Sequence, residues 1–233
     1  EKFMFNIRQK GFTLAEVLIT LGIIGIVAAM TMPTLIGKYQ KKQTAVQLKK
    51  VYTEMSQAVA LSELDNGDVK YWDYNLGAKD FYDKYMKKYL KKTSELTYGQ
   101  YKSQVTLKNL NGTTCSETWC TSSVSHYVRL ADGSIIGFSE YLGGNYKSFV
   151  VDLNGYKNPN TTGKDYFVFT IQDKFKVAPY GIGNSEGVTI GKTYDRDIIT
   201  GDNFRACNKT KTGVWCTALI MMDNWEIKDD YPW

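Results

Sequence analysis

The hydrophobic residues of this chain are unevenly distributed, and the first long run of them is almost unbroken. From Phe12 to Ile36 the only charged residue is Glu16. A helix needs roughly 20 consecutive apolar residues to cross the hydrocarbon core of a bilayer, and this run is long enough. The pattern therefore predicts a membrane-spanning helix with one carboxylate near its start, where a buried charge is costly.

The next stretch, from Lys38 to Leu64, keeps a helical period but becomes amphipathic. Apolar side chains recur at helical spacing and form one stripe, which consists of Leu48, Val51, Tyr52, Met55, Ala58 and Val59. Lysine, glutamine and glutamate side chains take the other faces, and Asn66-Gly67 is a typical stop signal. We expect one helix from about Phe12 to Leu64, whose second half packs on a globular domain.

Basic residues precede the apolar run and set its expected orientation. Lys2, Arg8 and Lys10 are opposed only by Glu1. Positively charged flanks stay cytoplasmic, so we expect the N-terminus inside the cell and the rest of the chain outside the cytoplasm. A secretory signal peptide is the main alternative, but its apolar region is usually about 7–15 residues long and ends at a small-residue cleavage site.

The segment KGFTLAEVLITLGIIGIVAAMTMP closely resembles the N-terminus of type IV prepilins and of the pseudopilins of type II secretion. The resemblance implies that a prepilin peptidase cuts between Gly11 and Phe12 and then methylates the new amine. It further implies that Glu16 pairs with the N-terminal amine of a neighbouring subunit. Gly25 and Pro33 stand where such chains often loosen the helix, because both residue types weaken a helix interior.

The same resemblance gives an organisation for the whole chain. Residues 1–11 are the expected leader, 12–36 the membrane and filament-core segment, and 37–233 a periplasmic or extracellular pilin-like domain. The implied function is a structural subunit of a type IV pilus or a type II secretion-like filament in the bacterial inner membrane. Its implied partners are other pilins, the peptidase, the assembly platform and the membrane.

A minor pilin that binds DNA for uptake is the alternative function. The formal net charge of +5 is mild for a chain of this size and does not indicate a dedicated nucleic-acid binder. The lysines between Asp80 and Lys92 are most simply a solvated helix face. Nucleic acid is therefore not an expected partner.

After Gly67 the pattern changes to shorter elements. Residues 80–92 predict a short amphipathic helix, and the alternation around Asp132-Gly133 predicts a β-hairpin. The segments YKSFVVDL, DYFVFTI and VWCTALIMM read as three further strands. The expected fold class is α+β and pilin-like, in which a long N-terminal helix, half membrane and half amphipathic, packs on an antiparallel sheet.

Four cysteines fall in two local pairs, Cys115 with Cys120 and Cys207 with Cys216. In an exported domain this predicts two disulfides between nearest neighbours. A zinc site is the competing interpretation, but its ligands would come from two loops that are far apart in the sequence.

The stretch VDLNGYKNPNTTGKDYF joins two expected strands and is rich in side-chain oxygens. Calcium is the one cofactor we consider, with Asp152, Asn154, Asn160 and Asp165 as candidate ligands, because this ion prefers carboxylate and amide oxygens. The competing interpretation is an ordered turn, in which Asx side chains bond to their own backbone and glycines adopt positive φ.

The sequence contains no constellation that supports an enzyme. His126 is the single histidine and lies in a strand-like segment, where a structural role is expected. Phosphate-binding glycine loops and clustered metal-ligand motifs are absent from the sequence.

Overall fold

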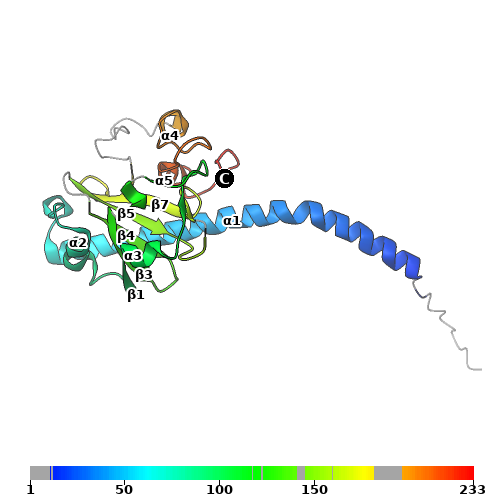
Figure 1. Cartoon of the computed structure of the whole chain (residues 1–233), viewed down its shortest axis with the longest axis horizontal. Coiled ribbons are helices and arrows are strands. Elements are labelled where there is room, and N and C mark those ends of the chain that lie inside the picture. The colour runs from blue at the N-terminus through cyan, green and yellow to red at the C-terminus, as the bar shows by residue number, and fades with distance from the viewer. Residues whose placement is uncertain are drawn as a thin grey trace, which may run out of the picture. The chain divides into compact units, whose positions relative to one another are not determined.

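The computed structural model describes residue 11 and residues 13–116, 118–121, 123–140, 145–158, 160–180 and 196–233. The chain divides into two compact units, Glu1–Lys41 and Lys42–Trp233. The helix α1, Leu14–Asn66, begins in the first unit and ends in the second (Figure 1). Each unit is described by itself below.

In the first unit, α1 is apolar on all sides and exposes its side chains. Leu14, Leu18 and Leu35 are 78%, 60% and 69% exposed. By length and composition the helix is apolar enough to cross a membrane, and its most apolar 18-residue window is not buried within the structure. A fully exposed apolar helix of this length requires a hydrocarbon environment or other helices around it.

In the second unit, α1 buries the predicted stripe against the sheet. Leu48, Met55 and Val59 are completely buried, and Tyr52 packs on Phe169 with ring centroids 6.3 Å apart. The helix ends at Asn66, next to Gly67 with a φ of 77°. This left-handed residue stops the helix where the sequence predicts it.

The core of the second unit is a six-stranded antiparallel sheet of order β1-β3-β4-β5-β7-β8. Its strands are β1 Lys92–Thr97, β3 Val124–Leu130, β4 Ile135–Ser139, β5 Tyr146–Asp152, β7 Tyr166–Gln172 and β8 Lys176–Pro179. A separate parallel pair joins β2 Leu107–Lys108 to β6 Asn160–Thr161. The order of long helix, short helix and antiparallel sheet confirms the α+β prediction, and the hairpin at Asp132-Gly133 connects β3 to β4.

Short helices complete the fold (Figure 1). They are the 3-10 helices η1 Val69–Tyr71 and η3 Thr118–Cys120, the π-helix η2 Tyr82–Met86, and the α-helices α2 Ala78–Phe81, α3 Tyr98–Lys102, α4 Arg196–Thr200 and α5 Cys216–Met222. The predicted helix 80–92 corresponds to α2 and η2. It ends at Met86, earlier than expected, and Lys92, the last residue of the predicted helix, begins β1.

The prediction that VWCTALIMM is a strand is wrong. Its central residues form α5, with the backbone N–H of Leu219 bonded to the carbonyl of Trp215 at 3.2 Å. Cys216 through Ile220 are all buried. A short segment that is apolar on every side carries no period that distinguishes a strand from a buried helix.

Candidate processing and assembly site

The predicted cleavage site lies at the boundary of the described structure. Gly11 is described and exposed, whereas Phe12 and residues 1–10 lie outside the described residues. Cleavage between Gly11 and Phe12 therefore stays a prediction of the sequence. From Thr13 onward the geometry is defined.

Glu16 is part of a reciprocal hydrogen-bond pair at the start of α1. Its carboxylate accepts hydrogen bonds from the backbone N–H and the hydroxyl of Thr13, both at 2.8 Å. The hydroxyl oxygen of Thr13 in turn accepts the backbone N–H of Glu16 at 3.2 Å. This is a capping box, and the segment TLAE carries its T-x-x-E signature. This local role of Glu16 was not predicted, although the four-residue signature marks it in the sequence.

Gly25 and Pro33 both lie inside the helix, which continues through them. Apart from the neighbouring residues and the backbone of the same helix, no described atom lies within 4 Å of the position that a side-chain Cβ at Gly25 would occupy. Pro33 has no backbone N–H, so the helix loses one internal hydrogen bond there. The helix is thus locally weakened at Pro33, and the predicted loosening in a filament stays a prediction.

Comparison with known families divides the chain near residue 33, close to the predicted boundary between the membrane segment 12–36 and the domain 37–233. Residues 6–32 match the prokaryotic N-terminal methylation motif, which includes the expected cleavage site and Glu16. Residues 34–233 match a family of unknown function (DUF6613). The chain belongs to this family. With the methylation motif at its N-terminus and an exposed apolar helix behind it, it is a membrane-anchored, type IV pilin-like subunit. No curated protein and no solved structure matches this pilin-like chain.

Both predicted disulfides of the pilin-like domain are formed. Cys115 pairs with Cys120 and Cys207 with Cys216, with Cα atoms 5.9 Å and 4.6 Å apart. Because these bonds use all four cysteines of the chain, the alternative of a zinc site built on cysteine is excluded.

The oxygen-rich loop centres on Asp152, which is 1% exposed at the end of β5. One of its oxygens accepts the backbone N–H groups of Asn154 at 3.2 Å and of Gly155 at 2.8 Å. The other accepts the Tyr101 hydroxyl at 2.7 Å and the Asn160 amide at 2.6 Å. Burial raises the pKa of Asp152 to about 7, while these hydrogen bonds oppose the shift.

The second carboxylate of the loop, Asp165, is held in the same way. It accepts the backbone N–H of Thr161 and the side-chain amide of Asn154, the latter at 3.2 Å. Burial raises the pKa of Asp165 to about 6. Gly155 and Gly163 adopt φ values of 65° and 83°, as the ordered-turn interpretation expects.

Calcium fits this loop only partly. The four candidate residues offer two carboxylates and two amide oxygens, while the ion takes six to eight oxygen ligands. The Oδ1 atoms of Asn154 and Asn160 are buried and accept no hydrogen bond from the described residues, but the carboxylate oxygens are engaged by N–H and O–H donors. The hydrogen bonds to Asp152 and Asp165 are sufficient to hold this loop in its ordered conformation. Calcium binding therefore stays a prediction.

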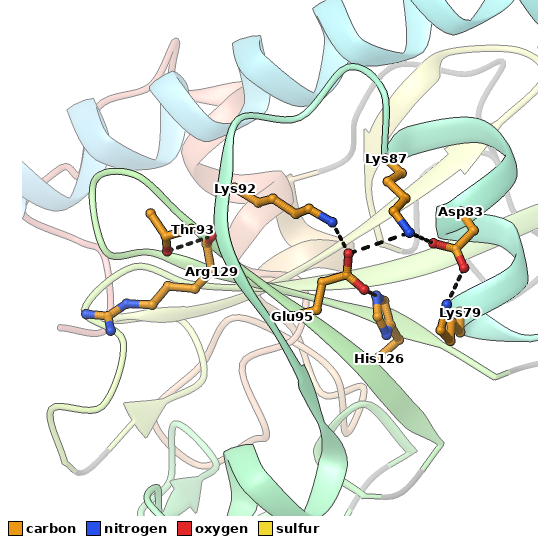
Figure 2. Close-up of polar contacts among 8 residues, drawn as sticks. All are labelled: Lys79, Asp83, Lys87, Lys92, Thr93, Glu95, His126 and Arg129. Carbon is orange, nitrogen blue, oxygen red and sulfur yellow. Dashed lines mark hydrogen bonds and ion pairs between the residues drawn. The ribbon is translucent and has the colours of Figure 1, made fainter.

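Figure 2 shows a ladder of ion pairs that the sequence did not reveal. Lys79 and Lys87 both bond to Asp83, the latter at 2.8 Å, and hydrogen bonds from these two lysines lower the pKa of Asp83 to about 2. Lys92 bonds to Glu95, whose carboxylate also lies 3.9 Å from Lys87. Lys87 and Lys92, two lysines of the expected solvated face, are therefore paired with carboxylates, as is Lys79 just before it.

His126 on β3 lies beside this ladder and is 7% exposed. Its ring packs on Tyr82 with centroids 4.8 Å apart, and its Nε2 is 3.5 Å from Glu95. Burial and then the charge of Lys79 lower the pKa of His126, so the ring is neutral at pH 7. This buried position agrees with the structural role expected for the residue.

Proposed function

We propose that this protein is a structural subunit of a type IV pilus or of a type II secretion-like filament. It is inserted in the inner membrane with its N-terminus in the cytoplasm, cut after Gly11 by a prepilin peptidase, and assembled through α1. The observation that supports this best is the helix from Leu14 to Ile36, which exposes apolar side chains on all sides and carries a single acid, Glu16.

The exposed apolar surface explains why such a subunit moves between only two environments. In the bilayer, lipid covers the helix, and outside it only the equivalent helices of neighbouring subunits can do so. The charge of Glu16 is costly in either apolar environment unless a cation pairs with it. The amine created at Phe12 of a neighbour is the partner that supplies this charge, which would fix the register of assembly.

Processing is tested with the full chain co-expressed with a prepilin peptidase. The mature chain should begin at a methylated Phe12 in intact-mass spectrometry. Gly11→Leu should leave the leader attached, because the site before the scissile bond requires a small residue. Gly25→Leu, a matched change inside the helix, should still be cut. Cleavage of the Gly11→Leu variant at the same bond would refute the proposed site.

Assembly is tested with two complementary variants at the start of α1. Glu16→Gln keeps a residue that can still cap the helix but removes the charge, whereas Thr13→Ala removes the cap and keeps the charge. We expect Glu16→Gln to be processed but absent from sheared filaments, and Thr13→Ala to assemble. Normal filaments from Glu16→Gln would contradict the proposed pairing.

No described feature favours DNA uptake over this function. Lys79, Lys87 and Lys92 are engaged with Asp83 and Glu95 rather than available as a group for phosphates. The full chain in nonionic detergent should therefore show no salt-sensitive shift of DNA in a gel, since phosphate contacts would make binding fall steeply with salt. Strong binding at low salt that disappears at high salt would restore the alternative.

A further inference from the structure

A small cavity lies on the sheet face that α1 does not cover. On β5, Phe149 stacks on Phe169 at 5.4 Å, and Phe169 in turn contacts Tyr52 of α1, so these side chains share the helix side of the sheet. Side chains alternate along a strand, so Ser148 and Val150 face the opposite side. They contribute to the floor of a cavity of about 120 Å³.

Two segments distant in the sequence form the walls of this cavity. Trp119 comes from the loop closed by the Cys115–Cys120 disulfide, and its carbonyl accepts the Tyr166 hydroxyl at 2.7 Å. Arg205 comes from the C-terminal part of the chain, and its guanidinium carbon lies 5.7 Å from the centre of the Trp119 ring and 5.5 Å from that of Tyr180. The rings orient the guanidinium, as cation–π contacts do.

The chemistry of the lining favours a negatively charged ligand. None of the described lining residues is acidic, and Arg205 supplies a permanent positive charge. Thr118, Ser139 and Ser148 add hydroxyl groups at the same cavity. Among the described residues, this combination of one cation, several hydroxyl donors and no carboxylate suits an acceptor-rich anion.

Trp119 provides the observation that points to a ligand. Its side chain is 4% exposed, and its buried indole Nε1–H has no hydrogen-bond acceptor among the residues that the structure describes. An unsatisfied buried donor costs about 1–3 kcal/mol, so native proteins seldom keep one without a reason. The indole can only donate, and therefore what it lacks is an acceptor atom.

We propose that this cavity binds the anionic group of a small ligand, a carboxylate or a phosphate, with Trp119 and Arg205 as its principal donors. The volume of about 120 Å³ equals roughly four water molecules, which suits one such group and little more. The site is built by the two disulfide-containing regions of the domain, and it does not depend on whether the chain assembles into a filament.

The test uses the ¹⁵N-labelled full chain in nonionic detergent at low chloride. The chain has five tryptophans, so its five indole N–H resonances can be followed during titration with inorganic phosphate, with acetate and with neutral glycerol. We expect a saturable shift of the Trp119 indole resonance with at least one anion and none with glycerol. Comparison of phosphate with acetate identifies which anionic group the site prefers.

Matched variants separate the site from general effects of salt. Trp119→Phe keeps an aromatic ring but removes the donor, and should weaken anion binding, followed by calorimetry, about tenfold or more. Trp215→Phe is the control, because Trp215 is also buried and its indole N–H has no acceptor in the described part of the chain, but it does not line the cavity. Arg205→Gln should abolish binding if it folds. An unchanged Trp119 resonance with every anion, or equal binding by Trp119→Phe, would overturn the proposal.

Discussion

The hydrogen bond between Tyr101 and Asp152 offers a sharp test of the buried network. Tyr101 on α3 is fully buried, its hydroxyl donates to Asp152 at 2.7 Å, and its ring stacks on Tyr127 at 4.2 Å. Tyr101→Phe removes one oxygen and leaves the ring in place. The substitution removes the donor to a buried carboxyl group, together with the hydrogen bond that the hydroxyl accepts from the Asn160 amide at 3.3 Å, with almost no change in packing.

The size of the effect depends on whether Asp152 is ionised. A hydrogen bond contributes about 0.5–1.5 kcal/mol between neutral groups and about 1.5–3 kcal/mol when one partner is charged. Burial raises the pKa of Asp152 to about 7, whereas an unfolded Asp titrates near 3.9. Between these values the folded chain holds a proton that the unfolded chain has lost. The contribution of Asp152 to stability therefore falls as the pH rises through this window.

Loss of the Tyr101 donor should consequently cost more at pH 8 than at pH 5. We expect about 0.5–1.5 kcal/mol at pH 5, where the carboxyl group of Asp152 is protonated, and about 1.5–3 kcal/mol at pH 8. For a domain of this size, 1 kcal/mol changes the Tm by roughly 2–4 °C. Asp165, with a pKa of about 6, also titrates between these limits, but it does so in both proteins and its effect cancels in the difference.

The assay is thermal unfolding of the full chain in detergent at both pH values, followed by near-UV circular dichroism. Tyr71→Phe is the matched control, because Tyr71 is 77% exposed, and its Tm should not change. An equal cost of Tyr101→Phe at pH 5 and pH 8 would show that Asp152 does not change its protonation in this window. A larger cost of Tyr101→Phe at pH 5 than at pH 8 would contradict the prediction that Asp152 is protonated at pH 5 and ionised at pH 8.

Further stability predictions use the same unfolding assay. Replacement of Cys207 and Cys216 by Ser should cost about 2–3 kcal/mol, because the disulfide closes a loop with a sequence separation of 9, and an unchanged Tm would argue against this cross-link. Leu48→Ala should cost about 2–5 kcal/mol, whereas Leu64→Ala, at 81% exposure, should change stability by less than about 0.5 kcal/mol. Gly155→Ala should cost more than about 1 kcal/mol, since φ is 65° and the new Cβ would lie 2.8 Å from a backbone oxygen; a neutral result would contradict this geometry. Calcium binding by the same loop predicts that a chelator lowers the Tm of the wild-type chain, and no change would remove that prediction.

Elements of the fold could be predicted where the local sequence carries a strong periodic or turn signal, and not elsewhere. The stripe on α1 was readable, because its apolar residues repeat over several turns, and Asp132-Gly133 marked its hairpin by turn chemistry. β1 was not predicted, because KTSELT is mostly polar and becomes a strand only by pairing with β3. Tertiary contact thus overrode weak local preference there.

The candidate sites show the same division between local and distant information. The capping box of Thr13 and Glu16 is encoded in four consecutive residues, whereas the resemblance to prepilins implies only a role of Glu16 in assembly. The meeting of Trp119 with Arg205 could not be predicted, since the two residues are distant in sequence and neither belongs to a periodic element. Such sites require the three-dimensional arrangement of the sheet and its loops.

The cap at the start of α1 bears on the proposed role of Glu16 in assembly, because it holds the carboxylate without neutralising its charge. Before assembly, the hydrogen bonds from Thr13 satisfy the carboxylate at the positive end of the helix dipole, so the charge has local partners. These bonds supply no countercharge, and a buried ion without one costs several kcal/mol. A neighbouring amine can remove that cost only if it reaches the first turn of α1. An offset of one helical turn, about 5.4 Å, would separate the charges. The cap therefore holds the carboxylate in a defined position, and the missing countercharge is what we expect to make assembly selective for one register.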